Sequence, residues 1–274
     1  MTLSSNSLFH FTRTIDNLKS ILENGFSISY CKEIFHLADH TFTAGIPMVS
    51  FCDIPLKLTD NHTHKYGKFG IGLTKEWGTK NYLNPVSYMQ PYSSLSSMIL
   101  PFLHNVLKND KYGNIRVKFE LTGSAKKAIL RYIDYDERIR NIAATVSLIS
   151  FMKNYEGYTE RNPTVLERFY DEREWRYVPN QYEKEQNNIY FHEIIDEEEY
   201  RDWRGDPKKP KPSLNHRKLN FDFGDIEYVI VDNKKSKGEI LELLKVNTAR
   251  FGSGDALLEF ATRILTIESL KKDF

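Results

Sequence analysis

The sequence predicts an α+β fold, with residues 1–274 in a single domain. Short runs in which polar and apolar residues alternate, as in half-buried strands, recur along the chain. Apolar residues at helical spacing occur between these runs and after them. With 274 residues, 40% of them hydrophobic, the chain can bury a full core, and it contains no internal repeat or domain-splitting linker.

The elements follow from the periodicity of the apolar residues. Strands are expected at residues 8–12, 47–51, 69–73, 115–121, 174–178 and 226–232, and helices at residues 15–23, 56–65, 136–153 and 237–245. Helix 136–153 is expected to be the longest, because Ile139, Ile142, Val146 and Ile149 recur every three or four residues. Loops are expected at residues 154–163 and in the Pro-rich segment 205–213.

The N-terminal strand and helix have the clearest local signals. Thr14 is expected to cap the helix, and Gly25 to end it with a left-handed backbone. Within the preceding run Leu-Phe-His-Phe-Thr, His10 shares a strand face with Leu8 and Thr12, opposite the two phenylalanines. Two interpretations are open for His10: a hydrogen-bonded core residue, or part of a ligand site.

Ser50 and Asp53 come at the end of the second strand, where sheets commonly expose binding groups. For Asp53 we favour a local role, as the cap of the helix that follows Pro55. The glycines at 67, 70 and 72 lack the strand–loop–helix context of a dinucleotide fingerprint and indicate a turn, followed by a strand that another backbone approaches closely.

Metal binding is not expected. His62 and His64 resemble half of a metal site, and His36 and His40 would share one face of a helix. Neither pair has an evident further ligand nearby in the sequence, so we predict no metal centre.

Glu172 and Glu174 are two residues apart, just before an alternating aromatic run. If both belong to one strand, their carboxylates point into the same cleft. A structural alternative is equally open, in which Glu174 pairs with Arg176 and Glu172 is solvated.

Charge and composition limit the partners and the compartment. The net charge of +1 gives no global field for nucleic acid or membrane. The basic residues of the segment around 205–218 can contact phosphates, but a solvated loop balanced by nearby acids is favoured. Without a leader or a membrane-spanning stretch, the protein is expected in the cytoplasm, with Cys31 and Cys52 as free thiols.

Several of these segments together resemble the bacterial abortive-infection family AbiGi. The resemblance rests on Leu-Phe-His-Phe-Thr at 8–12, Val-Ser-Phe-Cys-Asp-Ile-Pro-Leu at 49–56, Tyr-Gly-Lys-Phe-Gly-Ile-Gly-Leu-Thr at 66–74 and Glu-Arg-Glu-Trp-Arg-Tyr at 172–177. It implies a role in phage defence, with a toxin or antitoxin protein as partner. More distantly, the order of a strand His, a strand ending in Phe-x-Asp and a late strand Glu is similar to ADP-ribosyltransferases of the poly(ADP-ribose) polymerase and DarT types.

The second resemblance implies split antiparallel sheets, with a mainly helical insertion at about residues 93–165, and a site for NAD as the substrate. It assigns the catalytic roles to Glu174, Glu172 and His10, with Glu174 beneath the ribose. It assigns the NAD contacts to the following residues: His10, Phe11, Thr12, Ser50, Phe51 and Tyr66. Ser50 stands where the polymerase branch has a nicotinamide-stacking Tyr, so stacking would have to come from Phe51 or Tyr66.

Two functions of different classes follow from these resemblances. The leading expectation is an NAD-dependent mono-ADP-ribosyltransferase in phage defence or a toxin–antitoxin module, with a protein, a nucleic acid or a small molecule as acceptor. The alternative is a catalytically inactive antitoxin or sensor that binds a partner protein or nucleic acid. The missing stacking Tyr favours the alternative.

Overall fold

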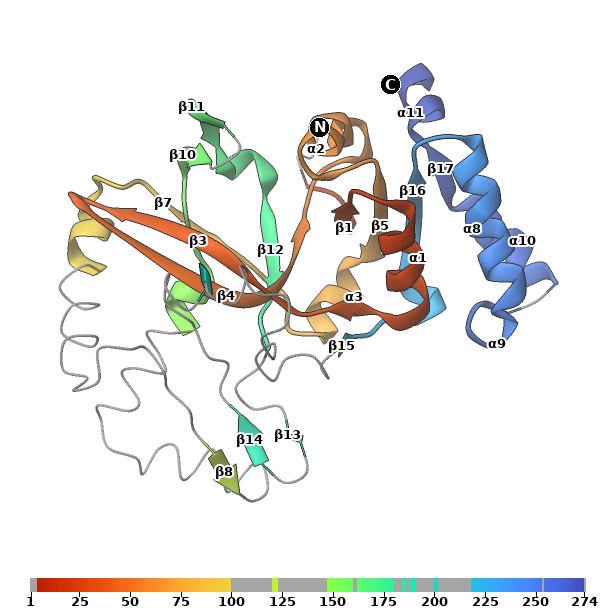
Figure 1. Ribbon diagram of the computed structural model, residues 1–274, viewed down its shortest axis with the longest axis horizontal. Helices are drawn as coiled ribbons and strands as arrows, with labels where there is room; N and C mark the ends of the chain where they lie inside the picture. Colours follow the sequence, from red (N-terminus) through yellow and green to blue (C-terminus); the bar gives the residue numbers. More distant parts are fainter. Residues whose placement is uncertain are drawn as a thin grey trace.

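The computed structural model describes residues 4–99, 120–122, 147–159, 162–179, 184–185, 188–190, 200–201, 218–252 and 254–273. Its largest sheet has the strand order β17-β16-β5-β1-β4-β12-β6, with β3 paired to β4 beside this path (Figure 1). All described pairs in this sheet are antiparallel except β16 with β17. The strands are β1 (Ser7–Thr12), β3 (Ser29–Leu37), β4 (His40–Cys52), β5 (Phe69–Thr74), β6 (Asn84–Pro85), β12 (Glu174–Tyr177), β16 (Ile226–Val231) and β17 (Ile264–Thr266).

Smaller sheets and helices surround this sheet. The smaller sheets pair β2 (Phe26–Ser27) with β15 (Lys218–Leu219), β7 (Ser87–Met89) with β9 (Met152–Asn154), β10 (Glu156–Thr159) with β11 (Asn162–Arg168), and β14 (Asn188–Tyr190) with both β8 (Glu120–Thr122) and β13 (Lys184–Glu185). The helices are α1 (Ile15–Asn24), α2 (Thr59–Tyr66), α3 (Lys75–Lys80), α8 (Lys234–Val246), α9 (Thr248–Phe251), α10 (Asp255–Thr262) and α11 (Ile267–Asp273), with short 3-10 turns η1 (Leu56–Leu58), η2 (Phe169–Glu172) and η4 (Phe223–Asp225). The predicted α+β class is therefore confirmed.

The central sheet is covered on both faces because its strands alternate. Leu8 of β1 belongs to the main core with Leu18 of α1 and Ile240 of α8. Phe9, the next residue along β1, belongs to a smaller cluster that Leu270 of α11 packs against. In Figure 1 the β3–β4 hairpin extends from the central sheet on the side away from α8 and α10.

The N-terminal helix forms as its sequence signals predict. The hydroxyl of Thr14 accepts a hydrogen bond from the Asn17 backbone N–H at 3.2 Å. Gly25 ends the helix with a φ of +73°, a conformation that favours glycine. The strands expected at 8–12, 69–73, 174–178 and 226–232 and the helices expected at 56–65 and 237–245 also form, within a few residues of the predicted ends.

Two predictions around residue 150 were wrong. The helix expected at 136–153 ends early, because β9 occupies Met152–Asn154; only residues 147–150 of the expected range are helical in the part described. The loop expected at 154–163 contains β10 and the start of β11, which pair as an antiparallel hairpin. β9 pairs with β7, which lies far earlier in the chain, and local periodicity does not reveal such a partner.

Other predictions fall wholly or partly outside the described residues. Within the insertion expected at about 93–165, the described parts contain helical residues 94–99 and 147–150 together with strands β8, β9 and β10 and the start of β11. Of the strand expected at 115–121, only its last two residues are described, and they belong to β8. The Pro-rich segment 205–213 lies outside the described residues.

The three glycines near β5 each make room for β1. Gly67 has a φ of +119°, and a Cβ there would lie 2.2 Å from the carbonyl oxygen of Thr12. Gly72 and Gly70 lie opposite Phe9 and Phe11 in the ladder, and a Cβ at either would meet those aromatic rings at 2.7 Å and 2.9 Å. The predicted close approach is therefore made by a backbone at Gly67 and by side chains at Gly70 and Gly72.

We expect Gly67→Ala to lower the free energy of unfolding by about 2 kcal/mol or more, because the methyl group meets backbone atoms in a conformation that L-residues avoid. Gly238→Ala is the matched control, since Gly238 lies inside α8 with open space around it. The free energy of unfolding of this control is expected to rise by roughly 0.5–1 kcal/mol. Urea unfolding measures both, and equal stabilities for the two variants would contradict the role given to Gly67.

Candidate functional site

A cavity of about 230 Å³ opens where β1 and β4 diverge. The two strands pair only at Phe9 and Cys52, so the sheet is split beyond that point. The residues lining the cavity are Phe9, His10, Phe11, Glu33, Ser50, Phe51, Cys52, His62, Tyr66, Lys153, Glu172 and Glu174. Every residue of the predicted site except Thr12 therefore lies at this cavity. Thr12 does not line it, and its hydroxyl accepts a hydrogen bond from the Asn17 side chain at 3.0 Å.

His10 lies at the split between the strands. Its Nδ1 is 2.9 Å from the carbonyl oxygen of Ser50, so Nδ1 carries the proton and donates it. The ring packs edge-on against Phe26 at 5.1 Å and is tilted against Phe51 at 5.7 Å. Burial lowers the pKa of His10, so the imidazole is neutral near pH 7, and Nε2 has no hydrogen-bond partner among the described residues. The hydrogen bond from Nδ1 confirms the hydrogen-bonded interpretation of His10, and the ligand-site interpretation stays a prediction.

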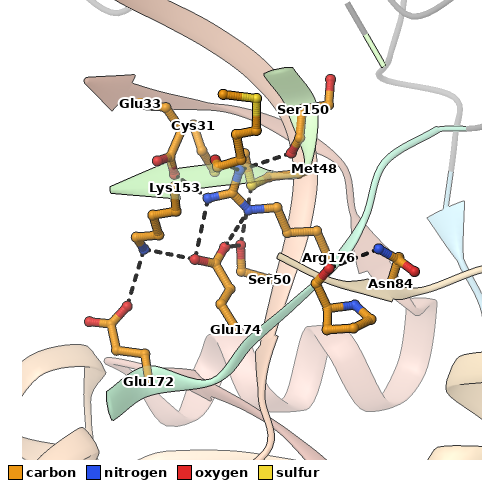
Figure 2. Close-up of polar contacts among 12 residues, drawn as sticks. Cys31, Glu33, Met48, Ser50, Asn84, Ser150, Lys153, Glu172, Glu174 and Arg176 are labelled. Atoms are coloured by element: carbon orange, nitrogen blue, oxygen red, sulfur yellow. Dashed lines mark hydrogen bonds and ion pairs between the residues drawn. The ribbon is translucent and has the colours of Figure 1, made fainter. Parts of the chain in front are cut away.

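Glu174 accepts hydrogen bonds on both carboxylate oxygens (Figure 2). Oε1 accepts from Ser50 Oγ at 2.9 Å and from Arg176 Nε at 2.7 Å. Oε2 accepts from Lys153 Nζ at 2.7 Å. Burial by itself raises the pKa of Glu174, but the charges of Arg176 and Lys153 outweigh that effect and hold the pKa well below its usual range.

Glu172 reaches the same place by a different route from the one predicted. It ends the 3-10 turn η2, and Arg173 has a φ of +45°, so Glu172 does not share a strand face with Glu174. Its carboxylate accepts from the Tyr66 hydroxyl at 2.5 Å and from Lys153 Nζ at 3.1 Å. Glu172 is 7% exposed, so the alternative in which it is solvated was wrong, whereas the pairing of Glu174 with Arg176 is present.

Arg176 ties this site to the β3–β4 hairpin and to residues 147–154. It is completely buried, and its Nη2 lies 2.9 Å from Glu33 Oε1 of β3. Its Nη1 donates to the carbonyl oxygen of Ser150 at 2.9 Å. Burial alone lowers the pKa of Arg176, but Glu174 and Glu33 raise it further than burial lowers it.

Three carboxylates and two cations, some of them buried and the others half-buried, form an ion cluster. We call it the cavity ion cluster: Glu33, Lys153, Glu172, Glu174 and Arg176. These five residues alone carry a formal charge of −1, and Lys65 Nζ adds a positive charge 3.7 Å from Glu172 Oε1. The sequence analysis missed Lys153 and Glu33, because they lie on β9 and β3 and nothing near them in the sequence indicates a carboxylate partner.

A second cavity of about 540 Å³ adjoins the first. The two cavities share Glu33, Tyr66, Lys153 and Glu172 as lining residues. The larger one is bounded by β3, α2 and the β10–β11 hairpin, and its lining includes the basic side chains of Lys32 and Lys65.

Asp53 has a structural role different from the one favoured above. It caps no helix, because η1 after Pro55 has no side-chain cap. Its Oδ1 accepts from the Ser5 backbone N–H at 2.8 Å, and its Oδ2 accepts from Lys75 Nζ at 2.8 Å. Asp53 therefore fastens the N-terminal segment to α3, outside the cavity.

The histidines considered for metal binding are arranged differently from the expectation. His36 lies on β3 and His40 begins β4, so the helix that would have brought them together is absent from the described structure. Within the described residues no group of three or more His, Cys, Asp and Glu side chains has the arrangement of a metal site. Cys31 and Cys52 are free thiols, as predicted. No helix among the described residues is long and apolar enough to cross a membrane.

The fold and the site together define an α+β protein with a cavity lined by charged residues, between two strands of a mainly antiparallel sheet. The family described as "Putative abortive phage resistance protein AbiGi, antitoxin" matches residues 24–232, so the chain belongs to the AbiGi family of abortive phage resistance proteins. It is 28% identical over 207 residues to the abortive phage resistance protein AbiGi of Lactococcus lactis subsp. cremoris, which covers 73% of this chain and 77% of that protein. No solved structure matches the chain.

We expect Arg176→Met to lower the free energy of unfolding by about 3–5 kcal/mol, because it leaves the buried carboxylates of Glu33 and Glu174 with too little positive charge. Lys245→Met is the control, since Lys245 and its partner Glu242 are 57% and 69% exposed. It is expected to change stability by less than about 1 kcal/mol. Denaturant unfolding measures both, and a similar small loss for Arg176→Met would show that the buried pairs are not stabilising.

The lowered pKa of His10 predicts a loss of stability on acidification. Below about pH 6.5 the unfolded chain binds a proton at this residue that the folded chain does not bind, so stability is full above that pH and falls below it. The slope reaches up to about 1.4 kcal/mol per pH unit. His10→Asn keeps a donor for the Ser50 carbonyl and does not titrate. Between pH 7 and pH 5 this variant should lose less stability to unfolding than the unaltered chain does. An equal loss in the two proteins would contradict the attribution of this pH dependence to His10. The exposed His40→Asn controls for removal of an imidazole.

Proposed function

We propose that this AbiGi-family protein is an NAD-dependent mono-ADP-ribosyltransferase that acts in phage defence, with NAD bound where β1 and β4 diverge. The supporting observation is that His10 and Glu174, which are far apart in the sequence, line one cavity together with Ser50 and Tyr66. These are residues to which the resemblance to ADP-ribosyltransferases assigns catalysis and NAD binding. They come from three neighbouring strands of one sheet and from α2.

The proposed reaction needs a negative charge beside the ribose. When the bond between nicotinamide and ribose breaks, its electron pair leaves with nicotinamide, which departs neutral, and positive charge develops on the sugar. A fixed carboxylate stabilises that charge more strongly in the transition state than in the ground state. Glu174 is the proposed stabilising residue, and its carboxylate is held in place by the cations of the cavity ion cluster.

The sizes of the two cavities are compatible with a ligand that binds partly in one cavity and partly in the other. The cavity of about 230 Å³ is smaller than the usual range for a drug-sized ligand, and it suits nicotinamide and its ribose. The adjoining cavity of about 540 Å³ then offers space for the remainder of NAD or for the acceptor. Phe9, Phe11 and Tyr66 provide aromatic surface at the smaller cavity. Phe51 is a weaker candidate for stacking, because its ring packs in the core against Trp77 at 5.4 Å.

A second function is favoured because other residues already use the hydrogen-bonding capacity of the Glu174 carboxylate. Its carboxylate accepts four hydrogen bonds, two of them from Arg176 and one each from Ser50 and Lys153, so it must exchange a partner before it can contact a ribose hydroxyl. This favours a catalytically inactive antitoxin or sensor that keeps the cavity and binds a partner protein. The description of the family as an antitoxin agrees with this alternative.

The experiment is incubation of the purified protein with NAD, with nicotinamide release measured by mass spectrometry and binding measured by thermal shift. We expect NAD to raise the melting temperature with concentration and nicotinamide to be released. Glu174→Gln should abolish release, because the amide cannot stabilise the developing charge. Glu227→Gln, an exposed change on β16, is the matched control and should release nicotinamide normally.

The outcomes separate the two functions. A thermal shift without nicotinamide release identifies a binding protein and rejects the transferase. The absence of both rejects the NAD site and leaves the antitoxin function. Because Glu174 is paired with two cations, the folding of Glu174→Gln must be checked by circular dichroism. Glu172→Gln provides a second variant in which an acidic residue of the site is neutralised, and its amide oxygen can still accept a hydrogen bond from Tyr66.

A further inference from the structure

Lys153 lies between the two cavities and pairs with both glutamates of the site (Figure 2). Its Nζ is 2.7 Å from Glu174 Oε2 and 3.1 Å from Glu172 Oε2. Burial lowers the pKa of Lys153, but Glu174 and Glu172 raise it further, so Nζ is charged near pH 7. Among the described residues, Lys153 is the one lysine or arginine that lines both cavities.

The two carboxylate oxygens of Glu174 are held unequally. Oε1 accepts from Ser50 Oγ at 2.9 Å and from Arg176 Nε at 2.7 Å. Oε2 accepts from Arg176 Nη2 at 3.3 Å, which is a long contact, and its short hydrogen bond comes from Lys153 at 2.7 Å. Lys153 therefore covers the oxygen of Glu174 that would otherwise have capacity for a ligand.

Of the two cations that donate to Glu174, Lys153 is the one that can move. Arg176 is completely buried, and its Nη1 also donates to two backbone carbonyl groups. The Lys153 side chain is 15% exposed and ends in a flexible chain of four carbons. When Lys153 leaves, Glu174 keeps Arg176, and Glu172 keeps the hydrogen bond from Tyr66.

The larger cavity offers the ammonium group another position. Lys153 Nζ lies over the Phe169 ring, 5.2 Å from its centre, and Phe169 lines the larger cavity but not the smaller one. The face of an aromatic ring attracts an ammonium group. The lysine torsions therefore allow Nζ to leave Glu174 and remain at this ring.

We propose that the contact between Lys153 and Glu174 is autoinhibitory, and that the site becomes competent when Nζ moves toward the larger cavity. The ammonium group covers Oε2 and cancels part of the negative charge that stabilises a cationic sugar. The inference deepens the proposed function, because it rests on Glu174 as the stabilising residue. If Lys153 served only to hold the site together, its removal would slow the reaction instead of accelerating it.

The test removes the ammonium group and then returns it as a separate molecule. Lys153→Ala lacks three carbons and the ammonium group of lysine, and propylammonium supplies those atoms. Nicotinamide release from NAD is measured by mass spectrometry with and without propylammonium, and propan-1-ol is the uncharged probe of similar size. Lys75→Ala is the matched control, since Lys75 also pairs with a carboxylate, Asp53 at 2.8 Å, and lies over a ring, Trp175 at 5.7 Å, outside the cavity.

The expected result is a gain of activity. Lys153→Ala should release nicotinamide about tenfold faster than the unaltered chain, because a charge-assisted hydrogen bond no longer has to break. Propylammonium should slow this variant toward the rate of the unaltered chain, and propan-1-ol should not. Lys153→Met, which fills the space of the lysine without a charge, should be as fast and should not respond to propylammonium. Lys75→Ala should release nicotinamide at the rate of the unaltered chain.

A second measurement needs no turnover. Propylammonium should raise the melting temperature of Lys153→Ala by occupying the position between the two carboxylates, and should leave that of the unaltered chain and of Lys153→Met unchanged. No stabilisation of Lys153→Ala would contradict a separate, exchangeable position for the ammonium group. Loss of folding in both Lys153→Ala and Lys153→Met, seen by circular dichroism, would assign Lys153 to the fold and overturn the inference.

The inference and the proposed function can fail separately. Release by the unaltered chain that neither substitution of Lys153 accelerates rejects only the inference. Release by Lys153→Ala and Lys153→Met alone supports the inhibitory contact and rejects transferase activity in the unaltered chain. No release from any of these proteins rejects both.

Discussion

Two cations, the half-buried Lys153 and the buried Arg176, hold the carboxylates of Glu33, Glu172 and Glu174 together, and the rest of the site depends on this pairing. A charge withdrawn from water is tolerated only when an opposite charge and hydrogen bonds replace the solvent. The five residues come from β3, β9, η2 and β12, so these separate elements must dock before all of the charges are satisfied. The cavity ion cluster therefore links the β3–β4 hairpin and residues 147–154 to the central sheet.

The cavity itself results from the way β1 leaves β4. These strands pair at one position only, and the His10 imidazole bridges the widening gap by donating to the Ser50 carbonyl. On the other side of β1, Gly70 and Gly72 give the rings of Phe11 and Phe9 room to lie over β5. The absence of two side chains on β5 thus positions two aromatic residues of the cavity wall.

Glu174 serves the fold and the proposed chemistry with the same carboxylate. Its pairing with Arg176 and Lys153 keeps it ionised and fixed in position, as a group that stabilises a cationic sugar must be. The same pairing occupies the carboxylate and reduces the negative charge that a ligand experiences. The description of the family as an abortive phage resistance protein and antitoxin agrees both with a catalytic Glu174 and with a Glu174 that serves the fold alone. A change at Glu174 is consequently expected to alter both the stability of the fold and the proposed activity.

The sequence by itself determined the α+β class, the first helix with its Thr14 cap and its Gly25 end, and most strands of the central sheet, because these depend on local periodicity and backbone preference. It also identified seven residues that line one cavity, through motifs that resemble a known family. Only the tertiary structure decided where Lys153 lies, how Glu172 reaches Glu174, and what Asp53 binds. Each of these depends on a partner distant in the sequence, and spacing along a chain carries no information about the charge or hydrogen bond that a fold brings to it.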